Sequence, residues 1–84
     1  MLRVLKNNKV IVFSIKKADL NHYHAEELLK GMLFFLYKNT LQDIIVVDLR
    51  DVNEVDSVGI GILSKIYDKY IKDEPNKQFV LIDK

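Results

Sequence analysis

Apolar and polar positions near the start of the chain follow the pattern of two β-strands. Residues 2–6 alternate between apolar and polar or basic side chains, and residues 9–16 (KVIVFSIK) are rich in β-branched and aromatic types. Both features favour strands. Asn7 and Asn8 separate the two segments, and asparagine tolerates the positive φ angles of tight turns. The sequence therefore predicts an N-terminal hairpin.

Two later segments repeat their apolar residues with the period of an α-helix. In residues 22–38, one set of apolar positions is spaced 3, 1, 3, 3 and 1 apart, namely Ala25, Leu28, Leu29, Met32, Phe35 and Leu36. Asp19 or Asn21 offers an N-cap in front of them. In residues 59–71, apolar and polar side chains fall on opposite sides of a helix. The only proline follows, at position 75, and ends the pattern. We expect one helix in each segment.

Two further segments have the composition of strands. Residues 44–49 (IIVVDL) form a continuous apolar run, which is typical of a strand buried on both faces of a parallel sheet. Residues 78–83 (QFVLID) are predicted to be the last strand. The predicted order is therefore β-β-α-β-α-β, an α/β fold in which helices pack on a small mixed sheet. At this length, residues 1–84 are expected to form one domain.

Composition narrows the classes of function. The chain has 13 basic and 12 acidic residues without a basic cluster, which disfavours nucleic-acid binding. It has no cysteine, hence no disulfide frame and no cysteine-ligated zinc. The N-terminus lacks the long apolar segment of a signal peptide. No apolar run approaches the length that spans a bilayer. We expect a cytoplasmic protein that does not insert into membranes.

The segment DVNEVDSVGIGIL, residues 51–63, is the strongest candidate for a site. Gly59, Gly61 and Ser64 nearly match a dinucleotide-binding fingerprint, but that motif must directly follow a strand, and the predicted strand ends near Leu49. We therefore expect no nucleotide cofactor. The segment also serves as a strand-to-helix joint, with Asp56 or Ser57 as the cap and Gly59 in a tight entry. Gly61 would let the helix approach the sheet.

Other polar residues give no sign of catalysis or metal binding. The acids around the motif, Asp48, Asp51, Glu54 and Asp56, lack an accompanying base–nucleophile pair, and we interpret them as solvated loop acids. His22 and His24 are two apart and would diverge on a helix, so a shared metal is not expected. The prediction is a protein that is not an enzyme and carries no cofactor or metal.

Residues 46–70 (VVDLRDVNEVDSVGIGILSKIYDKY) resemble the core signature of STAS domains, the family of bacterial anti-anti-sigma factors. The matching features are an Asp-Leu step that ends a strand, a short loop, an Asp-Ser-x-Gly motif at 56–59, and a helix that begins with small and aliphatic residues. Residues 20–28 (LNHYHAEEL) resemble the loop and helix start upstream in that family, although Asn21 stands where many members have Asp. The resemblance extends over residues 1–83.

The resemblance implies a regulatory role. In this family the serine after the motif aspartate is phosphorylated by a partner anti-sigma factor that is also a serine kinase, which gives Ser57 that role here. The implied partner surface combines the two loops, and its expected members are Asn21, His22, Tyr23, Asp56, Ser57, Val58, Gly59 and Ile62. For Val58 and Ile62, burial in the core is an equally good interpretation. The alternative function is a non-switching scaffold or accessory subunit of a larger complex, with Ser57 only a helix cap.

Two features concern assembly. Family members usually continue past the last strand predicted here with a helix, a strand and a final helix, so the C-terminal part of the family fold is expected to be missing. Leu33, Phe34 and Tyr37 widen the apolar stripe of the first helix. They either pack under the hairpin or form a contact with a second copy of the chain or with another partner, and we favour association.

Overall fold

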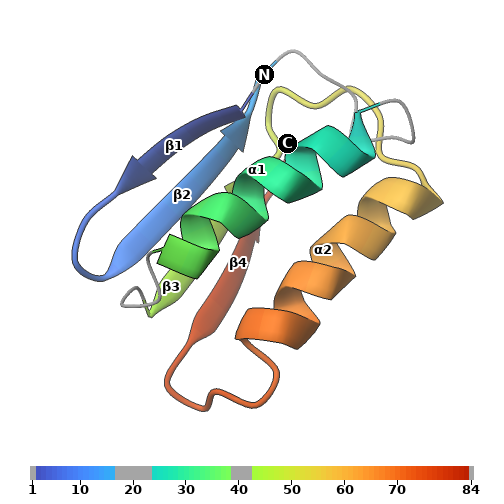
Figure 1. The fold of residues 1–84 in the computed structure, drawn as a ribbon. Coiled ribbons are helices and arrows are strands. Elements are labelled where there is room, and N and C mark those ends of the chain that lie inside the picture. The colour runs from blue at the N-terminus through green and yellow to red at the C-terminus, as the bar shows by residue number, and fades with distance from the viewer. Residues whose placement is uncertain (1, 17–23, 39–42, 84) are drawn as a thin grey trace.

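One four-stranded sheet carries both helices on the same face (Figure 1). The computed structural model describes residues 2–16, 24–38 and 43–83, and its elements follow the predicted order. The fold is the predicted α/β class with a small mixed sheet. The elements are β1 (Leu2–Lys6), β2 (Val10–Ile15), α1 (Ala25–Lys38), β3 (Ile44–Asp48), α2 (Ser57–Tyr70) and β4 (Gln78–Ile82).

The predicted hairpin is confirmed, and Asn7 builds its turn. Strands β1 and β2 pair antiparallel, with Val4 opposite Phe13. The Asn7 side chain accepts hydrogen bonds from the amides of Lys9 (2.8 Å) and Val10 (2.9 Å). An asparagine side chain that accepts from the following amides is a common way to stabilise a turn.

The strand order in the sheet is β1-β2-β3-β4. Strand β3 pairs parallel with β2 on one side and with β4 on the other. Each of the two crossovers moves one strand further in the same direction. Right-handed crossovers then place both helices on one face, as Figure 1 shows. The carboxyl ends of all three parallel strands therefore lie at one end of the sheet, next to the loop between β3 and α2.

The core lies between the helices and one face of the sheet. Phe13 and Val47 from this face are fully buried, and Met32 of α1 and Ile66 of α2 meet them from above. On the opposite face the apolar side chains are only half-buried, as at Val12, Ile44 and Val46. The expectation that 44–49 is buried on both faces is therefore wrong, because both helices cover the same side.

Helix α1 begins at Ala25, later than the pattern predicted; residues 22 and 23 and both proposed caps, Asp19 and Asn21, lie outside the described part of the chain. Of the apolar surplus on this helix, Leu33 packs against the core and Phe34 is 54% exposed. The Tyr37 side chain is not among those described. Only Phe34 is thus placed on the surface, where it contacts the ring of Phe35.

The glycine at which a helix closely approaches the sheet is Gly31, and the expectation for Gly61 is wrong. A Cβ atom built on Gly31 would lie 3.1 Å from Cδ2 of Leu2 in β1, which is tighter than ordinary van der Waals contact. A Cβ atom on Gly61 would meet nothing within 4 Å. Gly61 therefore costs helix stability without any packing benefit.

We predict that Gly61→Ala raises the free energy of unfolding by roughly 0.5–1 kcal/mol, because alanine loses less backbone entropy in a helix interior. Urea denaturation measures the difference. Gly31→Ala is the matched control and should gain less or lose stability, because its methyl group presses on Leu2. Equal gains at the two positions would contradict this account of α1 packing.

Candidate functional site

Ser57 is the first residue of α2 and is exposed, and the N-cap is Asp56. The Asp56 carboxylate accepts a hydrogen bond from the amide of Gly59 at 3.0 Å, and the Asp56 carbonyl accepts from Ile60 at 3.0 Å. Of the two caps that the sequence left open, the structure selects Asp56. The Ser57 side chain is not needed as the cap, and its hydroxyl lies at the positive end of the helix dipole.

Exposed apolar side chains flank Ser57 in the sequence. Val55 is 38% exposed, Val58 44% and Ile60 57%. We call these three residues the Ser57 apolar patch. Isolated apolar residues on a surface are ordinary, but three large ones between positions 55 and 60 offer apolar area that a protein partner could cover.

Two residues expected on the partner surface are instead internal. Ile62 is 5% exposed and packs in the core, and Gly59 is also buried. Ile62 faces the sheet because it lies on the same side of α2 as Leu63 and Ile66. For Ile62 the core interpretation is therefore right and the surface one wrong, whereas Val58 is exposed. Asn21, His22 and Tyr23 lie outside the described residues.

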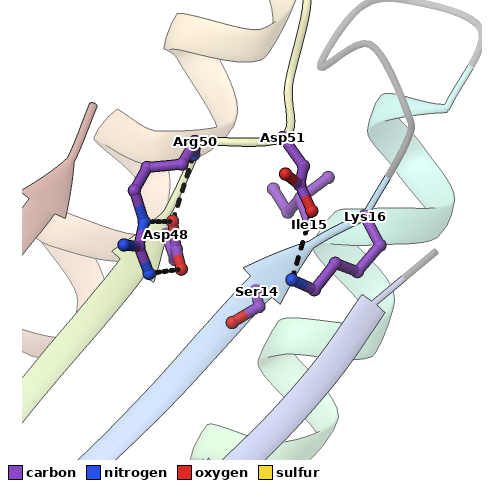
Figure 2. Close-up of a pocket in the computed structure, with 6 residues that line it drawn as sticks. All are labelled: Ser14, Ile15, Lys16, Asp48, Arg50 and Asp51. Carbon is purple, nitrogen blue, oxygen red and sulfur yellow. Dashed lines mark hydrogen bonds and ion pairs between the residues drawn. The ribbon is translucent and has the colours of Figure 1, made fainter. Parts of the chain in front are cut away.

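A buried carboxylate stands where β3 runs into the loop that leads to Ser57. Asp48 is 8% exposed and binds Arg50 through both carboxylate oxygens (Figure 2). Arg50 donates from its amide (3.1 Å) and Nε (3.0 Å) to Oδ1, and from Nη2 (2.9 Å) to Oδ2. These hydrogen bonds from Arg50 lower the pKa of Asp48 from 3.8 to about 2. The interaction fixes the first turn of the loop.

A second ion pair joins the end of β2 to the same loop. The Lys16 Nζ lies 3.1 Å from Oδ2 of Asp51. Together with Ser14, which is buried beside Asp48 in the sheet register, these groups line a small polar pocket at the carboxyl ends of β2 and β3 (Figure 2). Two cations and two carboxylates neutralise one another there. The two ion pairs hold the loop against the ends of β2 and β3, and they leave little net charge with which to bind an ionic ligand.

No element of the sequence pattern predicts this pairing. The interpretation of Asp48 as a solvated loop acid is wrong, because its carboxylate is buried and paired with the Arg50 guanidinium, whereas Asp51 is exposed. One signal was present, an arginine two residues after the aspartate that ends a strand. The involvement of Lys16 depends on strand pairing, which no local pattern reveals.

Within the described ranges, no group of three or more His, Cys, Asp or Glu side chains could hold a metal ion. In the same part of the chain, neither helix has the length and apolar character needed to cross a bilayer.

The Asp48–Arg50 pair predicts a pH dependence of stability. Because the pKa of Asp48 is lower in the folded chain than in the unfolded one, its contribution is complete above about pH 4 and is lost as the pH falls toward 2. We expect Arg50→Ala to lower the free energy of unfolding at pH 7, because it removes the side-chain hydrogen bonds that Arg50 donates to Asp48. Urea denaturation between pH 7 and pH 2 tests this.

The difference between wild type and Arg50→Ala should shrink between pH 4 and pH 2. Lys65→Ala, which removes an exposed cation from α2, is the control and should show little effect. A difference for Arg50→Ala that is independent of pH over this range would contradict the assignment.

The family model for the STAS domain matches residues 1–76. An anti-sigma factor antagonist from Mycobacterium paratuberculosis superimposes with a TM-score of 0.81 at 22% sequence identity. The match covers 100% of this chain and 67% of the antagonist's chain. The anti-sigma factor antagonist SpoIIAA in its unphosphorylated form superimposes with a TM-score of 0.77 at 12% sequence identity. That match covers 99% of this chain and 70% of the SpoIIAA chain. No curated protein matches the sequence.

The chain thus spans about two thirds of the length of each of these two solved structures. At such identities the likeness establishes the fold. The family model adds the sequence evidence, because it includes the loop from Asp48 to Asp56, Ser57 and the whole of α2. The chain belongs to the STAS domain family.

Proposed function

We propose that this chain is an anti-anti-sigma factor, a non-enzymatic regulator that binds an anti-sigma factor and is switched by phosphorylation of Ser57. The observation that carries the proposal is the placement of Ser57, exposed at the start of α2 within an exposed apolar patch and not used as the helix cap. Membership of the STAS family and the likeness to two anti-sigma factor antagonists support it.

The unmodified chain binds its partner through the Ser57 apolar patch. Val55, Val58 and Ile60 supply apolar area, and Asp56 and the helix start define where the partner docks. The upstream residues Asn21, His22 and Tyr23 belong to the same proposed surface. In this role the chain sequesters the anti-sigma factor in the cytoplasm, which frees a sigma factor without any contact between this chain and DNA.

Phosphorylation acts as a release switch. A phosphate on Ser57 adds a charge of about −1.5 to −2. The amides of Ser57 and Val58 precede the first intrahelical hydrogen bond and, with the helix dipole, accommodate that charge within the chain itself. The partner experiences the opposite effect, because a doubly charged group beside Asp56 opposes contact with apolar or acidic surface. The modification therefore weakens binding without unfolding α2.

The partner in this scheme is also the kinase. An anti-sigma factor with serine kinase activity must place the γ-phosphate of ATP against the Ser57 hydroxyl while it contacts the patch. Binding and phosphorylation then use the same surface. The phosphate that the reaction adds weakens the contact, so the kinase dissociates from its own product. No catalytic group on this chain is required, since the hydroxyl is a substrate.

We predict that Ser57→Asp weakens capture of the anti-sigma factor from source-cell lysate at least tenfold, because the added carboxylate stands beside Asp56. Ser57→Ala should bind like wild type and take up no phosphate from the captured kinase. The readout is mass spectrometry of captured proteins, with binding constants for the purified partner from calorimetry. Asn53→Asp adds the same charge at an exposed site in the same loop and is the matched control.

Thermal unfolding of Ser57→Asp shows whether a loss of binding comes only from a loss of stability. An acid at the first helical position should leave stability unchanged or raise it by a few tenths of a kcal/mol. If Ser57→Asp and wild type retain the same partners and no phosphate is found on Ser57, the switch is refuted and the non-switching scaffold or accessory role takes its place.

A further inference from the structure

The Ser57 apolar patch stands on two supports that differ in burial. Val58 and Ile60 belong to α2, whose inner face is buried against the sheet. Val55 belongs to the exposed loop segment 53–55 that precedes the cap. A partner that covers the whole patch therefore needs this part of the loop to be held in a fixed position relative to the helix.

The loop begins with a turn that is fixed to the sheet on one side by its backbone. The Val52 amide donates to the Leu49 carbonyl (3.0 Å) and closes the turn, and both side chains are buried. The Leu49 amide donates to the Ile82 carbonyl (2.8 Å), which attaches the turn to β4. The Asp48–Arg50 pair joins residues two apart and acts within the turn. The orientation of the turn also requires a contact on the other side of β3, where β2 lies.

Lys16 supplies that contact from the end of β2. Its Nζ lies 3.1 Å from Oδ2 of Asp51, as Figure 2 shows. Among the described residues, this is the ion pair that joins the loop to a different strand. The pKa of Asp48 is lowered mainly by its hydrogen bonds from Arg50, and the charge of Lys16 adds to the effect. Lys16 therefore interacts with two carboxylates, and a network of charges orders side chains better than an isolated exposed pair does.

We propose that Lys16 and Asp51 are positioning residues for partner binding, whose ion pair holds the loop part of the Ser57 apolar patch in the orientation that the partner covers. The inference rests on the proposed function, because it assigns two further residues to the same surface. A loop that is already held in its bound orientation loses less conformational entropy on binding, so the ion pair strengthens binding without touching the partner.

The exposure of the pair separates this role from a role in folding. The Lys16 and Asp51 side chains are 45% and 49% exposed. Ion pairs at that exposure contribute little to the stability of a fold. Loss of the pair should therefore weaken partner binding while the folded chain remains almost as stable as before.

A double-mutant cycle tests whether the two residues act as a unit. The ligand is the anti-sigma factor that the wild-type chain captures, and calorimetry on the purified proteins gives the dissociation constant. Lys16→Met and Asp51→Asn each remove one charge, and each should raise the dissociation constant about fivefold because the partner must then order the loop. The double variant should bind no more weakly than either single variant. Lys16→Arg keeps the charge and should bind nearly as well as wild type.

Two measurements on the chain without its partner complete the test. The melting temperature of Lys16→Met should lie within about 2 °C of the wild-type value. Backbone amide order parameters of residues 52–55, from NMR relaxation, should fall in Lys16→Met. Lys30→Met is the matched control, because it breaks the exposed Lys30–Glu26 pair within α1 (3.4 Å). It should change neither the order parameters of the loop nor the affinity for the partner.

Contrary results overturn the positioning role and the proposed function separately. Equal partner affinity of wild type and Lys16→Met refutes the positioning role alone, as do unchanged order parameters of residues 52–55. A double variant whose loss is the product of the two single losses shows that Lys16 and Asp51 act independently, which also refutes it. A wild-type chain that captures no anti-sigma factor refutes the proposed function, and the positioning role falls with it.

Discussion

The architecture depends on one constraint, that β2, β3 and β4 are parallel neighbours in sequence order. Parallel strands need a crossover, and two right-handed crossovers in the same direction place α1 and α2 on one face. The core and the half-buried opposite face both follow from this. So does the position of the loop from Asp48 to Asp56, which must carry the chain from the carboxyl end of β3 to the start of α2.

The Ser57 site is held by that loop and by the cap that follows it. Arg50 neutralises Asp48 at the strand end, Lys16 pairs with Asp51, and Asp56 closes the first turn of α2. Each contact removes freedom between the sheet and Ser57. An exposed serine on such a support suits a switch, since a new phosphate alters what a partner meets more than it alters the fold.

Periodicity predicted the element order because each element shows its burial pattern locally. The apolar pattern alone starts α2 two residues late, at 59, because it begins after the cap, whereas Asp56 sets the helix start at Ser57. The burial of Ile62 and the close approach at Gly31 depend on which helix face meets the sheet, which is a tertiary property. The exposure of Leu81 is equally a tertiary property, since β4 has the composition of a buried strand but is the last strand in the order of the sheet that the described residues form. Candidate residues 21–23 lie outside the described structure.

The central claim is that phosphate on Ser57 and partner binding exclude each other. The most direct measurement separates the chain in source cells into a partner-bound pool and a free pool, and maps phosphate in each pool by mass spectrometry. The account predicts phosphate on Ser57 in the free pool and none in the bound pool. Equal phosphate on Ser57 in the two pools, or a free pool modified at Ser64 and not at Ser57, would contradict it.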